Sequence, residues 1–347
     1  MWTNFVNRRC AAALFAAFAG AALCSAAALA SAAPTVPATP TARPIFVLNS
    51  NDANVSIIDG SSLKELRRLP TGKEPHHLYL SPDEKTLIVA NAASNSLTFI
   101  DPATAAVQRT VTGIADPYHL RFSPDMQWFV TAANRLNHVD LYRWQGAAHE
   151  QPFKLIKRIE ASKTPSHLAI DSRSAVVYVS LQDSDELMAI DLSTLAPRWK
   201  VKVGKVPADV FLTADDRTLL VAMMGDRFVE AYDVSGPQPR LIKRIETGDG
   251  AHAFRARGDK RHVFVSNRVA NTISLLDTAG LVVVATYPAP GGPDCMEMLA
   301  DNRTLLVTSR WARKLSFIDI EKKQVVKQVD VGRSPHGVWT LDHAPRQ

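Results

Sequence analysis

Cysteine is scarce in this sequence: the 347 residues include three, at positions 10, 24 and 295. Cys10 and Cys24 lie in an N-terminal segment with the pattern of a cleaved leader, so Cys295 is expected to be alone in the mature chain. A single cysteine excludes an intramolecular disulfide. An unpaired cysteine in an oxidising compartment is either buried and inert or kept for its chemistry.

The sequence also lacks the signatures of several common sites. It contains no G-x-S-x-G, no P-loop and no G-x-G-x-x-G, so hydrolysis by a nucleophile elbow and nucleotide binding have no support. There is no C-x-x-C-H, which argues against covalent c-type haem. Without the two arginines of the leader, 38 basic and 34 acidic residues remain, a net charge near +4 with no long basic run. This mild charge predicts neither a nucleic-acid partner nor insertion into a membrane after the leader is removed.

The N-terminal region predicts export. Residues 1–32 contain two arginines, an alanine-rich apolar run and small residues near Ala30, which is the pattern of a secretory signal peptide. Residues 33–44 are rich in proline and read as an extended linker. The sequence therefore predicts a signal peptide over 1–32, a linker over 33–44, and a folded domain over 45–347 in the periplasm or outside the cell.

A repeat of about 42 residues runs through that domain. "TGKEPHHLYLSPDEKTLIVANAASNSLTFIDPAT" aligns with "VGKVPADVFLTADDRTLLVAMMGDRFVEAYDVSG" and "APGGPDCMEMLADNRTLLVTSRWARKLSFIDIEK". Each of these units has a turn that ends in proline, an alternating strand, an acidic turn and two further apolar strands. The anchor residue of this turn recurs at steps of 42, 48, 42, 44, 42 and 42 residues, at Pro75, Pro117, Pro165, Pro207, Ala251, Pro293 and Pro335. Seven units of short alternating strands predict an all-β, seven-bladed β-propeller of four-stranded blades.

The two ends of the domain predict how the ring closes. The chain enters at "IFVLN", which matches the second strand of a repeat, and leaves at "PHGVWTL", which matches the first. The N- and C-terminal strands are therefore expected to share one blade, which removes two exposed sheet edges.

The strands "LIVANAASNSLTFID" and "VFVSNRVANTISLLD" resemble the YVTN-type repeat of secreted bacterial β-propellers, a group similar to the haem d1 domain of cytochrome cd1 nitrite reductases. The resemblance covers about residues 45–342. It implies that the strand after each anchor lies innermost, beside the central channel. The third and fifth residues after the anchor are apolar, as in Leu78 and Leu80, and are expected to face neighbouring blades.

The second and fourth residues after each anchor are then left for the channel. Six of the ten histidines lie at the start of these strands. Imidazoles from three consecutive blades suit zinc, copper or iron, with an aspartate, a cysteine or both beside them. The predicted metal residues are His77, His119, His167, Asp209 and Cys295. Arginines in the same channel favour carboxylates or a tetrapyrrole with propionates. The predicted cofactor-binding residues are Arg121, Arg255, Glu297, Tyr79 and Trp339.

Several functions stay open at this point. The first is binding of a metal ion, a metal-containing cofactor or a small anionic molecule in the central funnel. The second is catalysis, as a lactonase-like hydrolase or a cofactor-processing oxidoreductase, with a funnel histidine acting as general base near Glu297. The third is a scaffold for periplasmic protein partners. The alternative interpretation of the histidines is that they line a water-filled channel and form hydrogen bonds to water and to the ends of the strands. No residue is assigned a catalytic role from the sequence.

Overall fold

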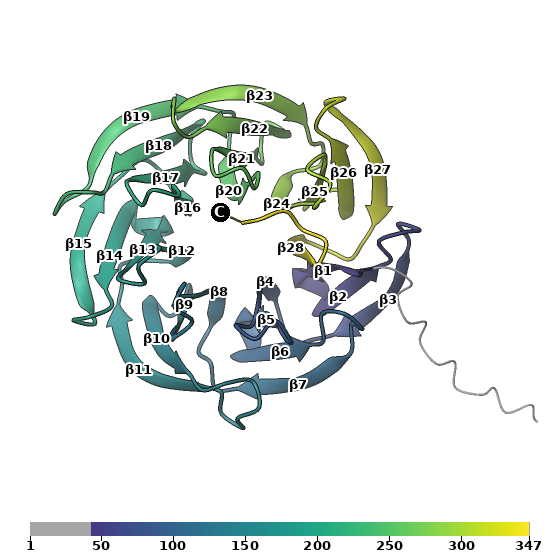
Figure 1. The fold of residues 1–347 in the computed structure, drawn as a ribbon, viewed down its shortest axis with the longest axis horizontal. Coiled ribbons are helices and arrows are strands. Elements are labelled where there is room, and N and C mark those ends of the chain that lie inside the picture. The colour runs from purple at the N-terminus through teal and green to yellow at the C-terminus, as the bar shows by residue number, and fades with distance from the viewer. Residues whose placement is uncertain (1–42, 347) are drawn as a thin grey trace, which may run out of the picture. The chain divides into compact units, whose positions relative to one another are not determined.

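The computed structural model describes residues 43–346, and these form a closed ring of seven antiparallel sheets (Figure 1). Each sheet has four strands, so the predicted seven-bladed propeller is confirmed. The predicted signal peptide and almost all of the predicted linker lie outside the described residues. No helix among residues 43–346 is long and apolar enough to cross a membrane.

The strands fall into four concentric sets. The innermost set begins at the anchor residues and comprises β28 (Pro335–Thr340), β4 (Pro75–Leu80), β8 (Pro117–Phe122), β12 (Pro165–Ile170), β16 (Pro207–Leu212), β20 (Ala251–Ala256) and β24 (Pro293–Met298). The second set comprises β1 (Ile45–Asn49), β5 (Leu87–Asn91), β9 (Trp128–Ala133), β13 (Val176–Leu181), β17 (Thr218–Met223), β21 (His262–Asn267) and β25 (Thr304–Ser309).

Outside these lie the third set and the rim. The third set comprises β2 (Asn54–Ile58), β6 (Ser96–Ile100), β10 (His138–Trp144), β14 (Glu186–Asp191), β18 (Phe228–Asp233), β22 (Thr272–Asp277) and β26 (Lys314–Asp319). The outer set comprises β3 (Glu65–Pro70), β7 (Val107–Thr112), β11 (Phe153–Glu160), β15 (Ala196–Lys202), β19 (Arg240–Glu246), β23 (Val282–Pro288) and β27 (Gln324–Asp330). Three short 3-10 turns connect second and third strands: η1 (Ser50–Asp52), η2 (Ala92–Ser94) and η3 (Gln182–Ser184).

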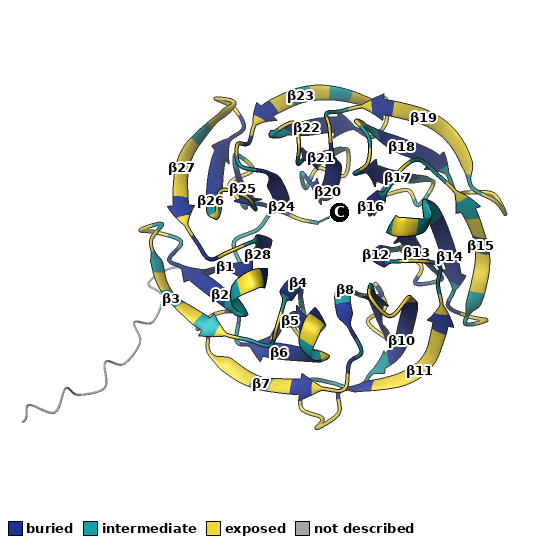
Figure 2. Ribbon diagram, turned by 180° about the vertical axis from the view of Figure 1, so that it is seen from behind, coloured by how far each residue is buried: buried dark blue, intermediate teal, exposed yellow. Residues whose placement is uncertain are grey.

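Burial decreases from the third strands to the rim. The second and third strands are almost wholly buried, whereas the outer strands alternate exposed and partly buried residues (Figure 2). Apolar side chains pack between adjacent blades: Leu168 and Ile170 of β12, for example, share a core cluster with Leu141 of the preceding blade. Leu78 and Leu120 are buried in equivalent clusters, as the alternation predicts. Because this packing is repeated around the ring, the blades together fix the position of the channel-lining strands.

The ends of the chain close the ring as predicted. β28 pairs with β1 in an antiparallel register that sets Thr340 against Ile45 and Trp339 against Phe46. The same sheet continues through β2 to β3, so one blade contains strands from both ends of the domain. Gly337 permits the close approach of β28 to its neighbours, since a Cβ there would lie 2.9 Å from Leu48 Cδ1 and 3.1 Å from the backbone oxygen of His76.

Candidate functional site

A β-bulge near the start of each innermost strand determines which side chains enter the channel. In β4, Pro75 pairs with Asn91 but Leu78 pairs with Val89, so one extra residue is inserted in the inner strand. The other six innermost strands have a register shift at the corresponding place. A bulge re-aims side chains locally. The histidines at both positions after the anchor therefore meet in the channel, whereas strict alternation would place them on opposite faces.

The residues at the first position after each anchor form a layer across the channel, which we call the outer layer. This layer belongs to the innermost strands and is distinct from the outer set of strands at the rim. Its members are His76, Tyr118, Ser166, Ala208, His252, Asp294 and His336. The ring of His76 packs between the tilted rings of Tyr118 and His336, with centroids 3.8 and 3.7 Å away. None of these seven residues is among the described residues that line the cavity of the channel. The outer layer therefore packs against itself on one side of the histidines at the second position.

Asp294 is the charged centre of the outer layer. Its carboxylate is fully buried and accepts hydrogen bonds from Arg268 (2.8 Å) and Arg310 (3.0 Å), and it lies 3.0 Å from His252 Nδ1. Burial alone raises the pKa of Asp294, but the two guanidinium groups and the neighbouring imidazoles outweigh it and hold the pKa well below its usual range. No role was predicted for this aspartate from its position in the repeat.

Replacing this carboxylate should destabilise the protein strongly. In Asp294→Asn, two guanidinium groups remain without their counter-charge, and breaking a buried pair in this way costs about 3–5 kcal/mol. Urea unfolding at pH 7.5 measures the loss. Asp330→Asn is a matched control, because Asp330 pairs with Lys314 at 2.6 Å on the exposed rim, where such a pair contributes about 0–1 kcal/mol. Equal unfolding midpoints for the two variants would contradict the assignment.

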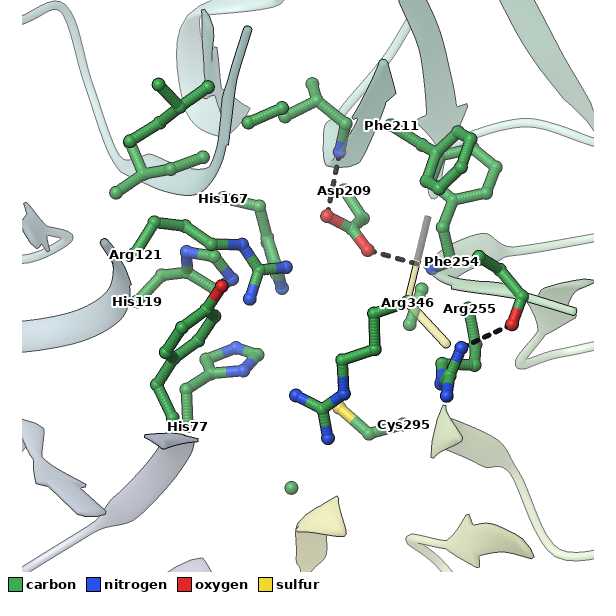
Figure 3. A pocket seen from close by; sticks show the side chains of 18 of the residues that line it. His77, His119, Arg121, His167, Asp209, Phe211, Phe254, Arg255, Cys295 and Arg346 are labelled. Atoms are coloured by element: carbon green, nitrogen blue, oxygen red, sulfur yellow. Dashed lines mark hydrogen bonds between the residues drawn. The ribbon is translucent and has the colours of Figure 1, made fainter. Parts of the chain in front are cut away.

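A cavity of about 460 Å³ occupies the channel on the other side of the histidines (Figure 3). It is lined by second-position residues, by most fourth-position residues and by Arg346 from the C-terminal segment. Its volume lies within the range of small-molecule sites, which is roughly 300–1,000 Å³.

Three imidazoles from consecutive blades meet at this cavity. The ring centroids of His77, His119 and His167 lie 4.4, 4.8 and 4.9 Å apart, and one nitrogen of each lies within 4.8 Å of the others. Each ring has a buried nitrogen without a hydrogen-bond partner among residues 43–346: Nε2 of His77, Nδ1 of His119 and Nε2 of His167. The other nitrogen of His167 bonds to Ser166 Oγ at 2.9 Å, which fixes the orientation of its ring.

Burial keeps these imidazoles neutral. Desolvation lowers the pKa of His167, and it lowers the pKa values of His77 and His119 well below the usual 6.5, with neighbouring histidines and Arg121 acting in the same direction. A neutral imidazole has a lone pair available for a metal ion at physiological pH. His77 also belongs to a second group of close nitrogens with His76 and His336, so the two layers form one continuous array.

The other two predicted metal residues line the cavity but belong to no ligand cluster among the described residues. The carboxylate of Asp209 accepts hydrogen bonds at 2.8 Å from the backbone N–H groups of Val210 and Phe254. The Cys295 sulfur lies 3.3 Å from His336 Nδ1, and burial raises the pKa of its thiol well above the usual value. Cys295 is therefore a protonated thiol beside the outer layer.

Four of the five predicted cofactor residues line the cavity, as two pairs. Tyr79 and Arg121 line the cavity, and the Arg121 guanidinium lies 5.4 Å from the centre of the Tyr79 ring. Arg255 and Glu297 also line it but pair with each other at 2.6 Å. Trp339 was also predicted to line the channel, but it is absent from the lining of the cavity. Its side chain is fully buried against Phe46, because packing between blades removes a large apolar ring from water.

Arg346, which was not predicted from the sequence, enters the cavity from the segment after the last strand. Residues 342–346 cross from β28 over β24: Ala344 N–H donates to Met298 O at 2.8 Å, and Ala300 N–H donates to Asp342 O at 3.2 Å. This segment, which we call the C-terminal strap, ends near the middle of the ring in Figure 1. It follows the last repeat, so no repeat position could have assigned it a role.

Comparisons with known proteins agree with this architecture. A model of the YNCE-like beta-propeller family matches residues 4–346. A search of curated proteins found no match. A protein of unknown function from Desulfotomaculum acetoxidans is similar in structure, with a TM-score of 0.73 at 15% identity over 88% of this chain and 100% of its own.

Two similar structures have functional names. The periplasmic gluconolactonase PpgL of Pseudomonas aeruginosa has a TM-score of 0.72 at 18% identity, over 86% of this chain and 98% of its own. The dihydro-heme d1 dehydrogenase NirN, solved in complex with DHE, has a TM-score of 0.64 at 17% identity, over 88% of this chain and 78% of its own. At these identities the likeness shows the fold alone.

Proposed function

This chain belongs to the YNCE-like β-propeller family, and from that premise we propose that it is a periplasmic binding protein whose central cavity holds a transition-metal ion. The ligands are the imidazoles of His77, His119 and His167. The observation that carries the proposal is the convergence of three neutral rings, each with a buried nitrogen that lacks a partner among residues 43–346. Unpaired buried polar atoms are costly, so three of them at one point favour a bound group.

The donor set favours a borderline metal over magnesium or calcium. Three nitrogen donors suit zinc, copper or iron, whereas magnesium and calcium prefer oxygen donors. Three protein ligands also leave a coordination position open toward the cavity, where a small molecule can bind. Asp209 and Cys295, the other residues predicted for the metal, would act at its margin, because neither groups with the three imidazoles.

Location in the periplasm is the second part of the proposal. It rests on the pattern of residues 1–32, which is that of a signal peptide. The name of the similar gluconolactonase, a periplasmic protein, is consistent with it.

The metal is tested by substituting the middle histidine. In His119→Gln one of three ligands is lost, so zinc or copper affinity should fall by more than about 100-fold, the upper end of what residues outside the ligand shell contribute. Elemental analysis of periplasm-purified protein and competition with a chelator measure it. His138→Gln is the matched control: His138 is a buried histidine of β10, 3.3 Å from Asp140 and absent from the cavity lining. Equal metal retention by parent and His119→Gln would end the three-histidine proposal.

Hydrolysis is the second candidate, because His77 lines the cavity wall and could take a proton from water. Two observations make it the weaker one. The pKa of His77 is far below 6.5 because its ring is buried, which makes it a poor base. Glu297, expected beside the base, is bound to Arg255 and Arg346 instead. Turnover of a lactone by metal-free protein, lost in His77→Gln, would favour the enzyme.

A further inference from the structure

The charges of the cavity wall indicate what accompanies the metal. Three guanidinium groups line the cavity, from Arg121, Arg255 and Arg346, against the two carboxylates of Asp209 and Glu297. A divalent ion on the histidines adds two more positive charges in a largely buried space. Uncompensated buried charge is expensive, so the wall favours an anion as the second occupant.

Arg255 is not available for that anion. Its Nε donates to Glu297 Oε1 at 2.6 Å, and its two terminal nitrogens donate to the carbonyl oxygens of Ala344 (2.8 Å) and Pro345 (3.1 Å) in the C-terminal strap. It also donates to its neighbour's carbonyl oxygen, Ala256 O. With its side chain almost fully buried, this arginine anchors the strap to the channel wall. The anion site predicted at Arg255 therefore lies elsewhere.

Arg121 and Arg346 each have guanidinium N–H groups that donate no hydrogen bond within residues 43–346. Arg121 stacks on Tyr79 and donates no hydrogen bond to any residue within 43–346. Arg346 donates through one terminal nitrogen to Glu297, while its buried Nε has no partner within the same residues. Both side chains are directed into the cavity in Figure 3. Guanidinium groups with free donors bind carboxylates through paired, charge-assisted hydrogen bonds.

The spacing along the strand brings the two parts of the site within reach of one small molecule. His119 and Arg121 are two residues apart in β8, which places their backbones about 6.6 Å apart along the channel at a strand rise of about 3.3 Å per residue. The histidines and the two guanidinium groups line the same cavity, so a ligand with two acidic groups joined by a short chain can contact both.

We infer that the cavity binds a small dicarboxylate, with one carboxylate on the metal held by His77, His119 and His167 and the other on Arg121 and Arg346. The metal half of this site rests on the proposed function; the anion half rests on the two arginines. The C-terminal strap thus supplies Arg346 as a specificity-determining residue. Arg255 holds the strap through the carbonyl oxygen of Ala344, and Glu297 pairs with Arg346 itself.

Titration calorimetry with succinate tests the inference. Zinc-loaded parent protein should bind succinate at least about tenfold more tightly than acetate, which has no second carboxylate, because hydrogen bonds to charged groups contribute roughly that factor or more. Arg121→Gln and Arg346→Gln should each remove this advantage, so that succinate and acetate then bind with similar affinity. Arg143→Gln is the matched control, since Arg143 also stacks on an aromatic ring, Trp128 at 3.7 Å, but is absent from the cavity lining.

Two results would overturn the inference: equal affinities for succinate and acetate in the parent, or parent-like succinate binding by Arg121→Gln. Arg121 makes no hydrogen bond within residues 43–346, so its substitution keeps the test valid even if Arg346→Gln weakens the strap. Titration of metal-free protein separates the two proposals. Succinate binding that depends on Arg121 but occurs without zinc uptake would sustain the anion site and refute the metal. Zinc uptake with no preference for succinate would sustain the metal and refute the dicarboxylate.

Discussion

Deleting residues 335–347 should unfold the propeller at room temperature. The deletion removes β28, the innermost strand of the closing blade, and with it Trp339 and His336, both fully buried. Losing a buried tryptophan alone costs about 3–5 kcal/mol, and the other buried residues of β28 add to that. Because a whole domain is stable by only about 5–15 kcal/mol, the ring should not survive the loss.

Circular dichroism during urea unfolding measures this effect, and the matched control is a deletion of residues 346–347 alone. The shorter deletion removes the end of the C-terminal strap but leaves β28 paired with β1, so its unfolding midpoint should stay close to that of the parent. The longer deletion also exposes the edge of β1, a buried strand of apolar residues, and should aggregate. A cooperative unfolding transition for the longer deletion, near the parent midpoint, would mean that the closing blade contributes little.

The fold could be predicted because the same pattern occurs seven times. One alternating strand is a weak signal, but the recurrence of the anchor at Pro75, Pro117 and Pro165 fixes both the repeat length and the first strand of each blade. The match of residues 45–49 to a second strand and of 335–341 to a first strand was enough to predict the shared blade. These are properties of the backbone, which the repeat encodes directly.

The channel was predicted less completely, because its details depend on departures from the repeat. His76 and His336 were not among the residues predicted for the site, but the bulge brings them against His77 in one array. A bulge is not visible in the alternation, because it adds a residue without changing residue type. Trp339 shows a second limit: its fourth-position place suggested the channel, but a large apolar ring is more stable between blades.

The sequence also did not show which arginine of the channel pairs with a carboxylate. Arg121 and Arg255 occupy equivalent positions in different blades, yet one stacks on Tyr79 with free donors and the other is consumed by Glu297 and the C-terminal strap. Which arginine is available depends on where the strap crosses the channel, and that segment lies outside the repeat. Arg346 was missed for the same reason.

Mild acid should unfold the metal-free protein. Burial lowers the pKa values of the histidines in both channel layers, that of His252 to about 3 and those of His76 and His336 well below 6.5. In the unfolded chain these groups titrate near 6.5, so below that pH the unfolded state binds more protons than the folded state. Stability is therefore fully present above about pH 6.5 and falls as the pH drops. At pH 5 each histidine that stays neutral in the fold costs about 2 kcal/mol.

Five histidines have a pKa lowered to about 3 or well below 6.5, and together they would remove an amount comparable to the whole stability of a domain, so the unfolding transition should come before pH 5. Urea unfolding at pH 7.5, 6.5 and 5.5, in the presence of a chelator, measures the slope. His252→Gln should reduce that slope by one proton, because its imidazole no longer has to remain neutral in the fold. His149→Gln, at an exposed loop position, should leave it unchanged. Stability that is constant between pH 7.5 and 5.5 would show that these imidazoles take up protons while still folded, and would remove the neutral donor set on which the metal site depends.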